Sequence, residues 1–286
     1  MSKTALLFPG QASQYVGMGR DIFDSSEDVR QLYSLASDEI GEDIAAISFE
    51  GPSEKLKMTR FTQPAILLHS LAALKVIDRE ELSFDFAAGH SLGEYGALAA
   101  CGALSLEDAI RAVVRRSALM EEACVASPGT MAAILGLTED QTTEVCEKAA
   151  SAGVVVPANF NSGGQIVISG ALTAVEKACE IALEMGAKRA IPLEVGGAFH
   201  SPLMQSARDG LEEFLGSVQF LKPNRPVIAN VTGKEVNDAN EIRELLVRQI
   251  TAPVRWMQTM DYLKECQVTQ TIEIGPGKVL SGLAKR

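Results

Sequence analysis

A serine lies at the centre of the sequence GHSLG, which occupies residues 89–93. The pattern G-x-S-x-G is typical of a nucleophile elbow, in which a serine projects from a sharp turn between a strand and a helix. Residues 84–88 favour a strand and residues 94–100 favour a helix, so the motif has the context it requires. Its two glycines lack the Cβ atoms that would clash in so tight a reversal. We therefore predict that Ser91 is a nucleophile beside the anion-binding N-terminus of a helix, with a purely structural glycine turn as the alternative.

A serine nucleophile needs a base, and the chain contains three histidines. His69 lies in an apolar helical segment, where we expect a core histidine with its hydrogen bonds satisfied. His90 adjoins Ser91 on an extended segment and is expected to point to the opposite side. His200 lies in the glycine-containing loop 196–202, and loops on a rigid scaffold often carry catalytic groups. His200 is therefore the predicted base by elimination, with an incidental loop histidine as the alternative.

The group that orients this base is left open by the sequence. A hydrolase triad would place an acid between the serine and the histidine in chain order. The acids in that interval have no distinctive setting. A backbone carbonyl is the alternative, because it can also hold one ring tautomer.

An arginine stands out on the amphipathic helix expected from residue 106 to about residue 123. Arg111 and Arg115 fall on its solvent face, whereas Arg116 lies at the edge of the apolar stripe beside Met120. A guanidinium in that place must find an anion or remain poorly solvated. Its planar fork fits a substrate carboxylate. A structural salt bridge or a snorkelling side chain agrees with the helical phase equally well.

The elements that must position these groups follow an α/β order. Between residues 131 and 193 the order is β-α-β-β-α-β, which is typical of a ferredoxin-like unit inserted into a larger one. The larger unit alternates short strands and helices, which predicts a mostly parallel sheet with helices on both faces. Its expected strands are 4–8, 84–88, 226–231 and 271–274, and its expected helices are 62–77 with Pro64 in the first turn, 94–100, 106–123 with Ser105 as its cap, and 241–249. The inserted strands are 131–135, 154–158, 165–169 and 189–193, with a turn at 161–164, and the inserted helices are 139–152 and 174–185.

Composition narrows the class of protein. The 286 residues carry a formal net charge of −11, which disfavours nucleic acid as a partner. The five cysteines form no CxxC pair, which argues against a disulfide framework and a thiolate metal site. The N-terminal apolar run is too short for a signal peptide, and no run is long enough to span a bilayer. We expect a soluble cytoplasmic protein that binds no membrane.

Taken together, these residues resemble the malonyl-CoA:acyl-carrier-protein transacylases of fatty acid synthesis and the related acyltransferase domains of polyketide synthases. The resemblance runs nearly from end to end. The motifs that carry it are FPGQ at 8–11, TQPA at 62–65, GHSLGEY at 89–95, Arg116, NFNS at 159–162, GAFHS at 197–201, Gln249, and PV at 253–254.

The resemblance implies a hydrolase-like large subdomain, residues 1–127 and 198–286, with a ferredoxin-like insert, residues 128–197. It implies Ser91 as nucleophile and His200 as base. It also implies that the Gln249 backbone carbonyl orients the histidine.

Further roles are implied for the rest of the site. The backbone N–H groups of Gln11 and Leu92 would form the oxyanion hole. Arg116 would pair with the malonyl carboxylate. Phe199 would go with malonyl over methylmalonyl. The remaining residues expected at the substrate are Gln63, as a lining of the acyl pocket, Asn159 and Met120.

One departure from the family pattern is Ala12, which stands where a glycine is usual. Its methyl group is expected to tighten or shift the Gln11 amide.

The implied reaction is ping-pong transfer of malonyl from malonyl-CoA to acyl carrier protein, with no metal and no cofactor. We expect a monomer that docks its acidic partner through a basic patch, either Lys188 with Arg189 or Lys285 with Arg286. Three alternatives remain: service to a polyketide pathway, a serine hydrolase or thioesterase, and a non-enzymatic docking module.

Overall fold

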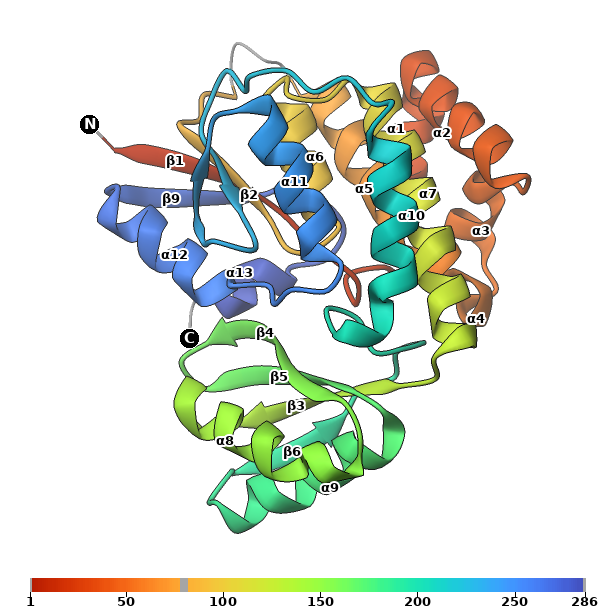
Figure 1. Cartoon of the computed structure of the whole chain (residues 1–286). Coiled ribbons are helices and arrows are strands. Elements are labelled where there is room, and N and C mark those ends of the chain that lie inside the picture. Colours follow the sequence, from red (N-terminus) through yellow and green to blue (C-terminus); the bar gives the residue numbers. More distant parts are fainter. Residues whose placement is uncertain (1, 78–81, 285–286) are drawn as a thin grey trace.

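A computed structural model of the chain describes residues 2–77 and 82–284. Figure 1 shows a larger α/β unit, with a smaller unit, formed by the elements between Thr130 and Pro192, below it. The Lys285 and Arg286 alternative for the basic patch lies outside the described residues. None of the described helices is long and apolar enough to cross a membrane.

The larger unit is built on a five-stranded sheet. Its strands, in spatial order, are β8 (Lys234–Val236), β7 (Val227–Ala229), β2 (Phe86–Gly89), β1 (Lys3–Phe8) and β9 (Val268–Glu273). Adjacent strands are parallel, except that β8 runs antiparallel to β7. The four expected strands are confirmed with small shifts in their bounds, whereas β8 was not predicted. Only one of its three residues is apolar, so it carries no hydrophobic pattern.

Strand β1 shows why the sheet needs helices on both faces. Leu6 and Phe8 pack into one core cluster, and Ala5 and Leu7 pack into another on the opposite face. All four side chains are fully buried. Helices α5 (Thr59–Val76), α6 (Gly93–Ala100) and α7 (Leu106–Ala126) contribute to the first cluster, and α12 (Trp256–Glu265) and α13 (Val279–Leu283) to the second. A strand buried on both faces reads as a continuous apolar run, as residues 4–8 do.

The helices of the larger unit were predicted only in part. Helices α6, α7 and α11 (Ala239–Gln249) are confirmed, and Ser105 caps α7 as expected. Within the described residues, seven further helices were not predicted: α1 (Arg20–Ser25), α2 (Glu27–Ile40), α3 (Ile44–Glu50), α4 (Ser53–Leu56), α10 (Gln205–Leu215), α12 and α13.

Helix α5 begins at Thr59 rather than at residue 62, so Pro64 lies inside the helix and not in its first turn as predicted. Proline cannot supply the N–H that the Arg60 carbonyl would otherwise receive. The Ser117 hydroxyl, on the neighbouring α7, lies 3.4 Å from that carbonyl, but its shorter bond, at 2.9 Å, goes to the Val114 carbonyl of its own helix. Helix α5 therefore continues through Pro64 without a strong replacement for the missing bond.

The smaller unit follows the predicted β-α-β-β-α-β order. It contains β3 (Thr130–Leu135), α8 (Glu139–Ala149) with a 3-10 turn (Ala150–Ala152), β4 (Val155–Ser162), β5 (Gln165–Gly170), α9 (Leu172–Glu184) and β6 (Arg189–Pro192). The spatial order β4-β5-β3-β6 is entirely antiparallel and is that of a ferredoxin-like sheet. Strand β4 continues through Asn161 and Ser162, so the turn is shorter than the predicted 161–164.

The two units meet through backbone as well as side chains. The Phe160 N–H donates to the Val254 carbonyl at 2.9 Å, and the Val254 N–H donates to the Ala158 carbonyl at 2.8 Å. These bonds extend β4 against the segment that precedes α12. The proposed boundaries at residues 128 and 197 stay predictions.

Candidate active site

Ser91 lies in the turn between β2 and α6, which is the predicted strand–turn–helix context. Its φ is 53°, in the left-handed region of backbone conformation that residues other than glycine rarely adopt. A Cβ on Gly89 would lie 2.0 Å from the Gly93 carbonyl carbon, and one on Gly93 would lie 2.1 Å from the Phe8 carbonyl oxygen. Both glycines are therefore required by close backbone approach, and the turn is held in a strained conformation that exposes the hydroxyl.

His200 lies against this serine. Its Nε2 is 2.9 Å from Ser91 Oγ, and its Nδ1 is 2.8 Å from the Gln249 carbonyl oxygen. A carbonyl only accepts, so Nδ1 carries the proton and Nε2 presents its lone pair to the serine hydroxyl. His200, like Ser91, adopts a left-handed backbone, with φ 58°. The structure thus places a backbone carbonyl, not an acid, behind the ring.

The environment of His200 favours the neutral ring. The side chain is 3% exposed. Burial, with the nearby positive charge of Arg116 as the second cause, lowers the pKa of His200 to about 3. At physiological pH the imidazole is therefore neutral, with Nε2 unprotonated and facing the serine hydroxyl.

Arg116 is buried beside the same hydroxyl. Its guanidinium donates to Gln63 Oε1 at 2.5 Å, to Ser91 Oγ at 2.9 Å and to Gln249 Oε1 at 2.9 Å. These acceptors are neutral, so in the described part of the chain no carboxylate contacts the charge. The Nε atom is buried and has no hydrogen-bond partner there. This arrangement differs from the salt bridge that the sequence left as an alternative.

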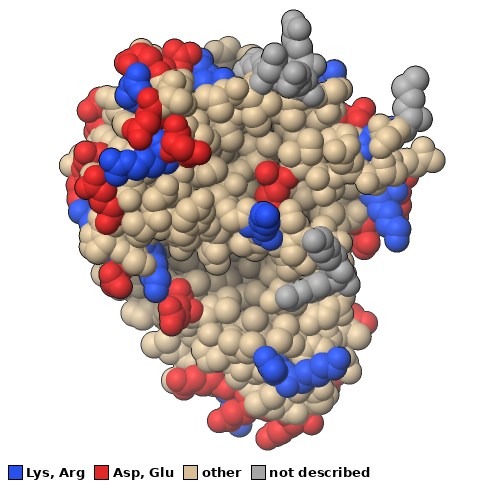
Figure 2. Space-filling model, turned by 180° about the vertical axis from the view of Figure 1, so that it is seen from behind, with Lys and Arg blue, Asp and Glu red and all other residues tan. Residues whose placement is uncertain are grey.

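A cavity of about 460 Å³ opens in front of Ser91 and His200, between the two units. The surface is hollowed between the larger and smaller parts of the molecule (Figure 2). Asn159 lines the cavity, and its side-chain oxygen is buried without a partner among the described residues. The other expected residues on its wall are Gln11, Met120 and Phe199.

Gln63 was expected to line the acyl pocket, but it does not lie on the cavity wall. It is fully buried and its oxygen is taken up by Arg116. Its amide nitrogen is 3.2 Å from Gln11 Oε1 and 3.5 Å from the Met120 sulfur. Gln63 therefore supports the guanidinium from behind.

The loop after β1 packs against the elbow. The His90 N–H donates to the Phe8 carbonyl at 2.9 Å. Among the described residues, neither the Gln11 N–H nor the Leu92 N–H donates a hydrogen bond, so both are available to an oxyanion. Ala12 has φ 78°, which explains why glycine suits this position.

The other two histidines lie elsewhere. His90 Nε2 is 2.9 Å from Asn161 Oδ1 and its ring packs on Trp256, so it faces away from the serine hydroxyl as predicted. His69 does not have the satisfied hydrogen bonds that we expected. Its Nδ1 is buried without a partner in the described part of the chain. The apolar pattern of α5 predicted its burial but not its neighbours.

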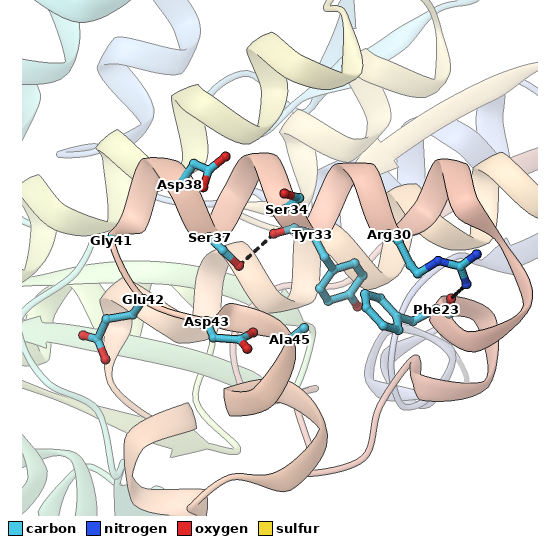
Figure 3. A pocket seen from close by; sticks show the side chains of 10 residues that line it. All are labelled: Phe23, Arg30, Tyr33, Ser34, Ser37, Asp38, Gly41, Glu42, Asp43 and Ala45. Carbon is cyan, nitrogen blue, oxygen red and sulfur yellow. Dashed lines mark hydrogen bonds between the residues drawn. The ribbon is translucent and has the colours of Figure 1, made fainter.

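A second pocket, of about 640 Å³, lies between α2 and α3 and is shown in Figure 3. The polar side chains that line it include Arg30, Ser37, Asp38 and Asp43. The Ser37 hydroxyl donates to the Tyr33 carbonyl at 2.8 Å, and no histidine lies on the wall. This pocket is larger but lacks a paired nucleophile and base, so the smaller cavity is the candidate site.

Two residues beneath the elbow were not among the predicted site residues. Asn230 accepts the Ser91 N–H at 2.7 Å, and Glu94 accepts the Asn230 N–H at 3.1 Å. Glu94 falls within the quoted GHSLGEY motif, which was its only sequence signal. Asn230 follows β7, and nothing in its local sequence distinguishes it.

Among the described residues, no group of histidines, cysteines and acids could hold a metal ion.

Comparison with known proteins shows which family the chain resembles in sequence and in structure. Residues 5–285 match the acyl transferase domain family. The malonyl CoA-acyl carrier protein transacylase of Bacillus subtilis is 45% identical over 100% of this chain and 90% of its own length. The solved malonyl CoA-acyl carrier protein transacylase of Coxiella burnetii is 40% identical, covers 100% of this chain and 90% of its own, and superposes with a TM-score of 0.95. A type II PKS acyl-carrier protein in complex with its malonyl-transacylase gives a TM-score of 0.94 at 43% identity, over 100% of this chain and 93% of the other.

Proposed function

The chain belongs to the acyl transferase family, and we propose that it transfers a malonyl group from malonyl-CoA to the phosphopantetheine thiol of an acyl carrier protein. The full-length relatives are named for this reaction. One observation carries the proposal: a single hydroxyl, Ser91 Oγ, is 2.9 Å from both the base nitrogen of His200 and the guanidinium of Arg116. Nucleophile, base and buried cation thus converge where a charged acyl group would be attacked.

The first half-reaction forms an acyl-serine. His200 Nε2 accepts the Ser91 proton while Oγ attacks the thioester carbon of malonyl-CoA. The free N–H groups of Gln11 and Leu92 stabilise the oxyanion, and each such donor contributes about 3 kcal/mol in comparable sites. When the tetrahedral intermediate collapses, the C–S bond breaks and the proton on His200 passes to the departing coenzyme A thiolate.

The second half-reaction reverses these steps with the carrier thiol. His200 accepts the thiol proton, the sulfur attacks the seryl ester, and Ser91 Oγ leaves with the proton. Arg116 holds the distal carboxylate through both steps, exchanging its neutral acceptors for a charged one. The proposed chemistry uses these side chains and backbone groups and needs no metal or redox cofactor.

The proposal also covers the pathway, the cellular location and the partner contact of the enzyme. Fatty acid synthesis is the preferred pathway, with a polyketide pathway as the alternative because one structural relative acts with a type II PKS acyl-carrier protein. All five cysteines are unpaired, which supports a reducing, cytoplasmic location. We propose a monomer that docks its acidic partner through the exposed Lys188 and Arg189.

Arg116 separates this proposal from a simple serine hydrolase or thioesterase, which has no need of a buried cation beside its nucleophile. The decisive experiment is intact-protein mass spectrometry after mixing with malonyl-CoA or acetyl-CoA. The wild-type protein should gain one malonyl group, and Ser91→Ala should gain none. Arg116→Ala should lose malonyl loading and gain acetyl loading, whereas Arg115→Ala, an exposed neighbour on α7, should behave as wild type.

Two results would overturn the proposal. A wild-type protein that never gains mass from malonyl-CoA favours a non-enzymatic docking module. Unchanged malonyl loading in Arg116→Ala would refute the carboxylate assignment.

A further inference from the structure

A buried acid that the mechanism does not use lies directly beneath the nucleophile. Glu94, in the first turn of α6, is 2% exposed. Its Oε2 accepts from Gln249 Nε2 at 2.7 Å and from the Asn230 backbone N–H at 3.1 Å. Burial of a carboxyl group is unfavourable unless such bonds compensate. Both donor residues also contact the backbone of the reacting serine: Gln249 Nε2 donates to the Ser91 carbonyl at 3.1 Å, and the Asn230 side chain accepts the Ser91 N–H.

The first branch runs through Gln249 to the base and to the cation. The Gln249 backbone carbonyl accepts from His200 Nδ1 at 2.8 Å, and its side-chain oxygen accepts from Arg116 at 2.9 Å. A glutamine amide can be placed with its oxygen and nitrogen exchanged. An ionised Glu94 only accepts, so it turns the NH2 group toward itself and leaves the oxygen facing Arg116.

The second branch runs through Asn230 to the elbow. The Asn230 side-chain oxygen accepts the Ser91 N–H at 2.7 Å, and its NH2 group donates to the Gly89 carbonyl at 2.6 Å. These two bonds hold the backbone of the turn from Gly89 to the Ser91 N–H. The Ser91 backbone is strained at φ 53°, and such conformations persist only where the surroundings hold them.

We propose that the ionised carboxylate of Glu94 is a positioning residue that sets Ser91, His200 and Arg116 for acyl transfer through Gln249 and Asn230. It touches no reacting atom itself. The inference rests on the proposed function, because it assigns Glu94 a role in that same site. It predicts that loss of the charge impairs the reaction even where the fold is intact.

The titration of Glu94 supplies a readout that a merely structural role would not change. Burial raises the pKa of Glu94 to about 7, against the lowering effects of Asn230, Gln249 and Arg116. The other titratable groups near it keep their state at neutral pH. Burial raises the pKa of Tyr95 further above its usual range, the pKa of His200 is about 3, and an arginine stays protonated.

The experiment compares Glu94→Gln with Glu107→Gln, an exposed acid in the first turn of α7. The saturated rate of malonyl-serine formation is measured from pH 6 to pH 8, beside denaturant unfolding. In the wild type the rate should fall as the pH drops through about 7. Glu94→Gln should unfold no earlier than the wild type, react roughly 10- to 100-fold more slowly and lose this pH dependence, because one hydrogen bond to a charged group is worth about that factor. Glu107→Gln should match the wild type.

Three outcomes overturn the inference: Glu94→Gln reacts at the wild-type rate, it retains the same pH dependence, or the wild-type rate is constant over this range. A rate that falls only as far as the folded fraction falls assigns Glu94 a structural role and refutes it as well. If the wild type forms no malonyl-serine at any pH, the proposed function itself has failed.

Discussion

Ala12 offers a direct measurement of strain in the loop that supplies the proposed oxyanion donor. Its φ of 78° lies in the left-handed region, and its side chain is exposed. For an L-residue this conformation costs about 1–2 kcal/mol. Glycine avoids that cost but is more flexible in the unfolded chain, which offsets about 0.5–1 kcal/mol. Ala12→Gly should therefore raise the free energy of unfolding by about 0.5–1 kcal/mol.

The assay follows from another feature of the chain. The sequence has one tryptophan, Trp256, and it is fully buried. Its fluorescence during denaturant unfolding reports the loss of the larger unit. For a chain of this length the expected gain corresponds to a rise in Tm of about 1–2 °C.

Gly41 provides the reverse substitution as a control. It is exposed, has φ 76°, and a Cβ there would meet no atom within 4 Å. Gly41→Ala should lower the free energy of unfolding by about the amount that Ala12→Gly raises it. If Gly41→Ala destabilises the protein while Ala12→Gly leaves the free energy of unfolding unchanged or lowers it, the reasoning about strain at Ala12 is refuted.

Three further predictions concern the elbow and the base. Gly89→Ala should destabilise the protein by about 3 kcal/mol or more in denaturant unfolding, because its Cβ would meet backbone at 2.0 Å, whereas Gly163→Ala, with no atom within 4 Å, should be near neutral. The free energy of unfolding of Ser91→Gly should exceed that of Ser91→Ala by about 1 kcal/mol, because the φ of 53° is less strained for glycine than for alanine. Neither variant forms an acyl-serine. Equal free energies of unfolding would argue against strain at this position. The His200 ring should remain neutral down to about pH 3 in an NMR titration, and Arg116→Gln should move its pKa upward by removing a positive charge; a ring that titrates near 6.5 in the wild type contradicts the assignment. Between pH 6.5 and about pH 3, His200 binds a proton in the unfolded chain but not in the folded protein. The free energy of unfolding should therefore fall as the pH drops from 6.5 toward 3.

The parts of the fold that could be predicted from sequence are those with local patterns. Strand β1 is an uninterrupted apolar run because both of its faces are buried, and the ferredoxin-like order follows from clean alternation of short segments. Strand β8 has one apolar residue in three and gave no such signal. The start of α5 was placed three residues late because Pro64 was assigned to the first turn, whereas the helix continues through it.

The site shows the same division. Ser91 stands in a local motif, and His200 was found because the chain has only three histidines. Gln63 was expected on the cavity wall, yet it supports Arg116 from behind, since no pattern within α5 shows which neighbour takes up its amide. Asn230 contacts the elbow across 139 positions of sequence. Such a contact between distant polar groups leaves no periodic trace in the chain.

The pairing of β1 with β9 has a consequence for synthesis on the ribosome. The first strand of the sheet lies between β2 and a strand formed by residues 268–273. A nascent chain therefore holds one open edge of β1 until residues 268–273 have emerged. The side chains around Ser91 also come from separate stretches of the chain: Arg116, His200 and, last of the three, Gln249. Acylation competence should thus appear only in nascent chains that extend beyond β9, and chains that stop before it should be both inactive and in need of protection at that exposed edge.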